Sequence, residues 1–169
     1  MPFDLPGVEQ GSDLETLFKA VGFVVVQCGF AEQSLDLTVA SIFHSYNGHP
    51  LVKRRPSMLQ PKLDFLSWCF TELPKLQEFQ AESVPLLSRF AVAGKKRNDL
   101  VHGAVASLSA QDGAFPFWKI DVSPKESHSI RSVFLDQTDW TTFRKELMSL
   151  GEDGQSLAQR VWDALKNKQ

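Results

Sequence analysis

The sequence predicts a mainly helical protein: an up-down bundle of four or five helices, with a small β hairpin or three strands inserted before the C-terminal helix. Apolar residues recur at steps of three, four and seven over residues 12–103 and again from residue 139, which is the period of an amphipathic helix. Between these stretches, at about 104–135, short segments rich in branched and aromatic residues favour strands. We therefore expect a flexible leader at 1–11 and a single helical domain over 12–169, with the β segment inside it.

The first helix is expected to begin at a capping box, Ser12–Glu15. The serine hydroxyl can accept from the glutamate amide, while the glutamate carboxylate reaches back to the serine amide. An apolar stripe then continues to about Tyr46, where Asn47-Gly48 favours a helix end. A helix of this length would be roughly 50 Å long. We therefore expect it to bend or break near Gly22 or Gly29.

Two shorter helices follow. Pro61 suits the first turn of the second helix, whose inner face is predicted to contain Leu63, Leu66 and Phe70. Ser83-Val84-Pro85 is expected to open the third helix, and Gly103 to end it in the left-handed cap conformation. The inner stripe of the third helix is predicted to consist of Leu86, Phe90, Ala93, Arg97 and Leu100. One arginine therefore shares a face with apolar side chains.

The chain then changes period twice. Strands are expected within Val105–Ser109, Phe115–Val122 and Ile130–Leu135, and Asp112-Gly113 between the first two is a hairpin-turn signal. From Asp139 the helical period returns. The pattern runs across Gly151 and Gly154, so either one kinked helix or two short helices would account for it. The predicted apolar face consists of Phe143, Leu147, Leu150, Leu157, Val161 and Leu165.

Composition excludes several classes of protein. With 43% apolar and 22% charged residues over a length of 169, the chain is neither collagen-like nor disordered. Its two cysteines, Cys28 and Cys69, lie in apolar helical patterns, so we expect no disulfide framework, no metal cluster and a reducing cytoplasm. The longest fully apolar run near the start is Phe23–Val26, and the N-terminus lacks the order of a signal peptide. We therefore expect no membrane span.

The net charge of −2 hides an uneven distribution of charge. Two windows, residues 37–63 and 83–98, contain no acidic residue. They hold eight of the eighteen basic residues, namely Lys53, Arg54, Arg55, Lys62, Arg89, Lys95, Lys96 and Arg97. If the fold brings these windows together, a local positive field would concentrate phosphate groups. Two ordinary solvated faces are the alternative.

The segment richest in chemistry lies at the end of the third helix. Arg97, Asn98 and His102 combine a permanent cation, an amide and an imidazole that can titrate near neutral pH. On an ideal helix Asn98 and His102 are neighbours, so the amide can orient the imidazole. Arg97 and His102 lie about 140° apart on the same helix. A site shared across a two-fold axis between two copies is therefore more natural than one within a single chain.

This segment resembles the motif of the HEPN superfamily, in which an arginine and a polar residue are followed by a histidine after four to six residues. The match is Arg97-Asn98 with His102, and four residues intervene between the arginine and the histidine. A long first helix carrying Glu32 and a shorter helix opening near Pro61 agree with it, so the resemblance covers about residues 12–103. It implies a helical homodimer. In many members it also implies a metal-independent endoribonuclease of toxin or defence type, without a cofactor.

The resemblance also implies roles for individual residues. His102 would be the general acid or base, Arg97 would clamp the phosphate, and Asn98 would position one of them. The basic residues expected to attract the RNA backbone are Lys95, Lys96, Lys53, Arg54 and Arg55. Glu32 and Asp99 are candidate partners of Arg97. Besides RNA and a second copy of the chain, an antitoxin or regulatory protein is an expected partner.

Other interpretations remain open. His102-Gly103 is also what an ordinary helix end looks like, and Arg97 could be a structural arginine. A non-catalytic helical dimer that binds a protein or a nucleotide is the alternative function. His44 and His49 have the wrong spacing for a metal pair, and His128 lies in a serine-rich connector. The four tryptophans, Trp68, Trp118, Trp140 and Trp162, are interpreted as core or interface anchors rather than as a platform for bases.

Overall fold

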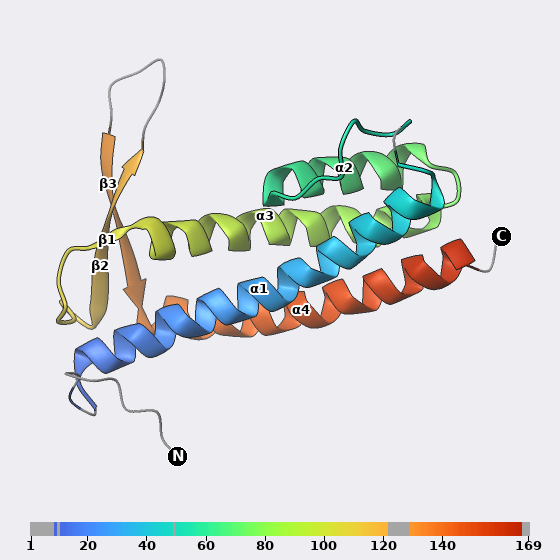
Figure 1. Cartoon of the computed structure of the whole chain (residues 1–169). Helices are drawn as coiled ribbons and strands as arrows, with labels where there is room; N and C mark the ends of the chain where they lie inside the picture. Colours follow the sequence, from blue (N-terminus) through green and yellow to red (C-terminus); the bar gives the residue numbers. More distant parts are fainter. Residues whose placement is uncertain (1–8, 10, 49, 122–128, 167–169) are drawn as a thin grey trace. The chain divides into compact units, whose positions relative to one another are not determined.

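The computed structural model describes residues 9, 11–48, 50–121 and 129–166 (Figure 1). These residues form four α-helices, one 3-10 helix and a three-stranded antiparallel sheet that precedes the last helix. The mainly helical class and the place of the β element are thereby confirmed. The elements are α1 (Asp13–Ser45), α2 (Leu59–Glu72), η1 (Gln77–Phe79), α3 (Gln80–His102), β1 (Ala104–Val105), β2 (Ala114–Asp121), β3 (Ser129–Asp136) and α4 (Gln137–Lys166). Except for Glu9 and Gly11, the expected leader lies outside the described residues.

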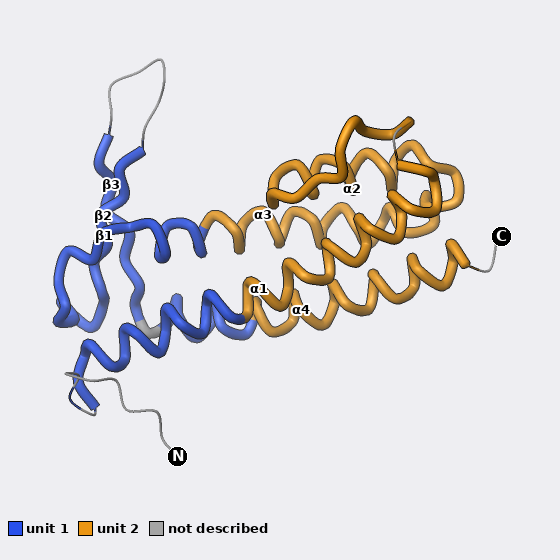
Figure 2. The backbone as a smooth tube through the Cα atoms, viewed as in Figure 1, with its two compact units in different colours: residues 1–26, 96–145 blue, residues 27–95, 146–169 orange. Residues whose placement is uncertain are grey.

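The chain divides into two compact units (Figure 2). The first comprises residues 1–26 and 96–145, and the second comprises residues 27–95 and 146–169. The boundaries fall inside α1, α3 and α4, so each of these helices contributes residues to both units. The sheet and the last turns of α3 belong to the first unit, whereas α2 and η1 belong to the second.

In the second unit, α2 packs against α1 and α3, and its Leu59 side chain lies against Gly94 of α3. The ammonium of Lys62, itself buried, pairs with Asp36 of α1 at 2.7 Å and joins α2 to α1. Gly154 of α4 lies directly against Ser34 of α1 and the buried ring of Phe90 of α3. A Cβ atom at this position would overlap the Ser34 hydroxyl and press tightly on the Phe90 ring, so the glycine permits the close approach of three helices.

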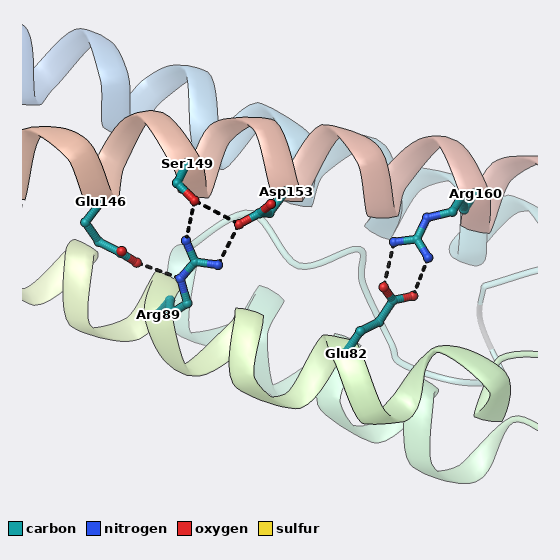
Figure 3. Close-up of polar contacts among 6 residues, drawn as sticks. All are labelled: Glu82, Arg89, Glu146, Ser149, Asp153 and Arg160. Atoms are coloured by element: carbon teal, nitrogen blue, oxygen red, sulfur yellow. Dashed lines mark hydrogen bonds and ion pairs between the residues drawn. The ribbon is translucent and has the colours of Figure 1, made fainter.

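A polar network on the surface of the second unit also joins α3 to α4 (Figure 3). The guanidinium of Arg89 donates to Glu146 at 2.6 Å, to Asp153 at 2.7 Å and to the Ser149 hydroxyl at 3.0 Å. The hydrogen bond from Arg89, with a smaller contribution from Ser149, lowers the pKa of Asp153. The network therefore fixes the register of the two helices most firmly when its carboxylates are ionised.

In the first unit, the strands are hydrogen-bonded in the order β1-β2-β3. Asp112 and Gly113 have positive φ angles of 50° and 78°. Gln111 and Ala114 on either side of them exchange two backbone hydrogen bonds. This is the two-residue turn that an Asp-Gly pair favours, so the predicted hairpin turn is confirmed.

The two faces of the sheet differ. One face buries Phe115, Phe117 and Leu135. Side chains alternate between the faces along a strand, so the opposite face carries the neighbouring residues. That face exposes large apolar side chains, and its four most prominent members are Trp118, Ile120, Ile130 and Phe134.

Helix α1 differs from its prediction in two respects. It runs without interruption from Asp13 to Ser45, so of the expected bend or break near Gly22 or Gly29 the break is wrong. Glycine costs about 1 kcal/mol relative to alanine inside a helix. The buried apolar residues of α1 before and after each glycine offset that cost. At the N-terminus the Ser12 hydroxyl accepts from the Glu15 amide, as predicted. The Glu15 carboxylate, however, accepts from the Gly11 amide instead of completing the capping box.

Three other boundaries also differ. Helix α3 begins at Gln80, before the expected Ser83, because the 3-10 turn η1 leads directly into it; Pro85 therefore lies inside the helix. Strand β1 has only two residues. Helix α4 is one helix rather than two, and it begins at Gln137 where the Asp136 carboxylate accepts from the Asp139 amide at 2.7 Å. The apolar faces predicted for α2 and α4 are buried.

By length and composition, α1 could cross a membrane. Its most apolar window has a mean hydropathy of 1.5, and 28% of that window is buried. Core helices of water-soluble proteins pass the same test, so this is weak support for a span. The prediction of no span rested on the short length of each uninterrupted apolar run. Polar uncharged residues interrupt such a run but leave the helix apolar and weakly charged on average.

Candidate functional site

The predicted motif occupies the last two turns of α3, in the first unit. Leu100 is buried, which fixes the rotation of the helix end, and Arg97 on the same stripe is half-buried. The Nη1 atom of Arg97 donates to the side-chain oxygen of its exposed neighbour Asn98 at 2.9 Å. The guanidinium and the amide are therefore held together.

His102 is the last residue of α3, and its side chain is exposed. Its imidazole makes no hydrogen bond to any other described residue, so both ring nitrogens are open to solvent. Among the described residues, Asn98 makes no hydrogen bond to His102, and its side-chain oxygen accepts from Arg97 instead. Within one chain, no hydrogen bond brings His102 and Arg97 together.

Gly103 ends α3 for a different reason than the sequence indicated. Its φ angle is not positive, so it does not adopt the left-handed cap conformation. A Cβ atom here would instead overlap the carbonyl oxygen of Asp99 and lie 3.4 Å from the Cβ of Phe117. Because Gly103 has no side chain, the chain can turn from α3 into β1 close to the last turn of α3. His102 therefore lies at the junction of the helix and the sheet.

Asp99, a predicted partner of Arg97, has a structural role. It is buried, and both of its carboxylate oxygens accept from the guanidinium of Arg131 on β3. Arg131 also donates to Asp121 at 2.7 Å, and these two acids, Asp99 first, raise the pKa of Arg131 above its ordinary value. The ion pair fastens the sheet to the end of α3. No sequence pattern indicated Arg131, because it lies 32 residues from Asp99.

Two of the predicted basic residues next to the motif, Lys95 and Lys96, are exposed. Lys96 lies over the ring of Phe143, with its Nζ atom 5.0 Å from the ring centroid, and Lys95 is solvated. The ammonium of Lys119 on β2 lies 3.4 Å from the main-chain oxygen of Asn98, which adds a cation that the sequence reading missed. Three cationic side chains, Lys96, Arg97 and Lys119, therefore belong to the first unit beside the motif.

The remaining predicted residues belong to the second unit. Lys53, Arg54 and Arg55 are exposed in the segment that precedes α2. Glu32 is half-buried on α1.

The other histidines and the tryptophans add detail. His44 is exposed at the end of α1, whereas His49 and His128 lie outside the described residues. A search of the described residues finds no cluster of three potential metal ligands. A core position is wrong for three of the four tryptophans, since Trp68, Trp118 and Trp162 are 44%, 55% and 41% exposed. Their role as interface anchors stays a prediction.

Comparisons with models of known protein families, with curated proteins and with solved structures gave no match to this chain. The HEPN resemblance therefore rests on the motif at the end of α3 and on its helical surroundings. The two groups of the motif that could take part in chemistry are the exposed imidazole of His102 and the guanidinium of Arg97, which donates to Asn98.

Proposed function

We propose that this chain is an HEPN-like endoribonuclease that cleaves RNA without a metal ion or a cofactor. The observation that carries the proposal is the state of the motif. The His102 imidazole is exposed and has no hydrogen-bonding partner among the described residues, and Arg97, five positions earlier, is oriented by Asn98. A histidine needed only to end a helix would not require an oriented guanidinium nearby.

The chemistry needs little from the protein because RNA carries its own nucleophile. His102 accepts the proton of the 2′-hydroxyl as the 2′-oxygen attacks phosphorus. Arg97 binds the non-bridging phosphate oxygens and stabilises the charge that grows on them. The bond to the 5′-oxygen breaks, and that oxygen takes a proton from a protonated imidazole. The products are a 2′,3′-cyclic phosphate and a 5′-hydroxyl, and DNA is not cleaved because it lacks the nucleophile.

The proposal includes a homodimer of HEPN-like up-down bundles. Arg97 and His102 point about 140° apart on an ideal helix, so one chain does not aim both groups at one phosphate. Two copies related by a two-fold axis at the end of α3 would supply each group twice. Lys96, beside the motif, contributes positive charge that attracts the RNA backbone, and Lys95, Lys53, Arg54 and Arg55 of the second unit are proposed as further contacts for it. The setting that we propose is a cytoplasmic toxin or defence enzyme restrained by an antitoxin or another regulatory protein.

Cleavage of mixed-sequence RNA in EDTA tests the proposal. We expect the wild-type protein to cut RNA and the Arg97→Ala, His102→Ala double variant to be inactive. The matched control is the Arg144→Ala, His44→Ala double variant, which removes one arginine and one histidine from exposed positions outside the motif. It should keep wild-type activity. Equal activity of all three proteins, or activity in none, would refute the proposal.

A second candidate function is supported by the outer face of the sheet. Trp118, Ile120, Ile130 and Phe134 are each more than half exposed on one face of β2 and β3, and apolar patches of this kind mark protein-binding surfaces. In this reading the dimer is a non-catalytic module that binds a protein or a nucleotide. A Trp118→Ser, Ile130→Ser variant would then lose its partner, whereas the Arg97→Ala, His102→Ala variant would keep it.

A further inference from the structure

A depression in the second unit, separate from the motif, combines cationic and aromatic side chains. It lies between the segment Leu51–Met58 and α2, and its volume is about 650 Å³. This is within the range of roughly 300–1,000 Å³ typical of small-molecule sites. Its walls include Arg54, Arg55 and Trp68. From the sequence, we expected the two arginines to contribute to a general positive field and the tryptophan to lie in a core or interface.

Both arginines are available to a ligand. Arg54 and Arg55 are exposed, and their side chains make no ion pair or hydrogen bond with any other part of the chain that the structure describes. One acid lines the same depression, Asp64, and its carboxylate accepts from the Gln60 amide at 2.8 Å. The depression therefore carries an excess of positive charge. Paired guanidiniums suit an anion with several oxygens, above all a phosphate.

The aromatic wall is equally accessible. Trp68 is 44% exposed and Met58 is 71% exposed, while Phe65, which also lines the depression, is buried. An exposed tryptophan face and a flexible thioether beside it suit a flat ring. Stacking of a nucleic-acid base on an aromatic side chain tolerates any base, because every base has a π face. An apolar protein partner would use the same tryptophan, but it would not need two unpaired arginines.

We propose that this depression binds a nucleoside phosphate, with the base against Trp68 and the phosphate between Arg54 and Arg55. The same chemistry occurs in a free nucleotide and in one residue of an RNA strand. If RNA is the substrate of the chain, the depression is a second contact that holds the strand, and this part of the inference rests on the proposed function. The binding itself does not require cleavage.

The experiment measures binding in a background that cannot cleave RNA. Every protein carries His102→Ala, and the probes are a fluorescein-labelled uridine decamer, followed by fluorescence anisotropy, and unlabelled UMP and uridine as competitors. We expect the Arg54→Gln, Arg55→Gln double variant and the Trp68→Ala variant each to raise the Kd at least about tenfold. Trp68→Phe should restore most of the affinity lost in Trp68→Ala. Uridine should compete at least about tenfold more weakly than UMP.

Matched controls remove the same residue types elsewhere. Trp162→Ala deletes a tryptophan of similar exposure on α4, and Arg144→Gln deletes an exposed arginine; both should bind like the parent. Circular dichroism checks that each variant is folded.

The outcomes separate the possible sources of the ligand. Equal affinity for UMP and for the decamer assigns the site to a free nucleotide, and much tighter binding of the decamer assigns it to a strand. Wild-type affinity in the Arg54→Gln, Arg55→Gln variant, or no binding of either probe by the parent, would overturn the inference. Because cleavage is absent throughout, failure of the proposed ribonuclease activity leaves this result unaffected.

Discussion

Gly154 provides a quantitative test of the helix packing in the second unit. A Cβ atom there would overlap the Ser34 hydroxyl and lie 3.1 Å from both the Ser34 Cβ and the Phe90 ring. Ser34 is buried and already donates to the Ala31 carbonyl at 2.6 Å, so it cannot move freely. Overpacking of a core costs about 1–3 kcal/mol, whereas replacing glycine by alanine in a helix gains about 0.5–1 kcal/mol. We therefore expect Gly154→Ala to lower the free energy of unfolding by about 1 kcal/mol.

Gly22 is the matched control for this substitution. It also lies inside a long helix, but a Cβ atom there would meet nothing within 4 Å. Gly22→Ala should therefore raise the free energy of unfolding by about 0.5–1 kcal/mol. Urea unfolding followed by circular dichroism measures both changes, and the two midpoints should move in opposite directions by about half a molar. Stabilisation by Gly154→Ala equal to that of Gly22→Ala would refute the close approach of the helices.

Three further predictions follow from individual side chains. The pKa of Asp153 is lowered by Arg89, so its ionised form adds stability above the unfolded pKa near 3.8, and that stability is lost as pH falls through the lower folded value. In the Asp153→Asn variant, the free energy of unfolding measured with urea should therefore fall less between pH 5 and pH 2.5 than in the wild type. An equal fall in both proteins would contradict the pairing of Asp153 with Arg89. Burial raises the pKa of the Cys69 thiol to about 12, so it should not react with a thiol reagent at pH 8 until urea unfolds the protein. Reaction in the native state would show that Cys69 is accessible. Asp99→Asn and Arg131→Gln should each lower the urea midpoint, and the double variant should lose less than the sum, whereas strictly additive losses would argue against their contact.

The sequence predicted those turns and helix ends that depend only on residues close together in the chain. Asp112-Gly113 indicated its hairpin turn because both residues tolerate a positive φ, and Asn47-Gly48 indicated the end of α1 for the same reason. The Ser12 cap was also visible, because its hydroxyl contacts an amide only three residues away.

Contacts between distant residues could not be predicted in this way. The pairing of Asp99 with Arg131 depends on how β3 returns to α3, and the sequence carries no local trace of it. The hydrogen bond from Arg97 to Asn98 was also hidden, because helical spacing made His102, at i+4, the expected neighbour of Asn98 and gave no sign of a bond to the adjacent residue. The exposure of Trp68 was missed for a related reason, since burial depends on what the rest of the chain leaves uncovered.

The ends of the RNA products test the central claim most directly. Mass spectrometry of a short RNA of known sequence, incubated with the protein in EDTA, identifies the chemical group at each new end. We predict 2′,3′-cyclic phosphate and 5′-hydroxyl ends from the wild-type protein, formed about 10²- to 10⁴-fold more slowly by His102→Ala. Products with 5′-phosphate ends, or cyclic ends formed at an undiminished rate without His102, would contradict the account.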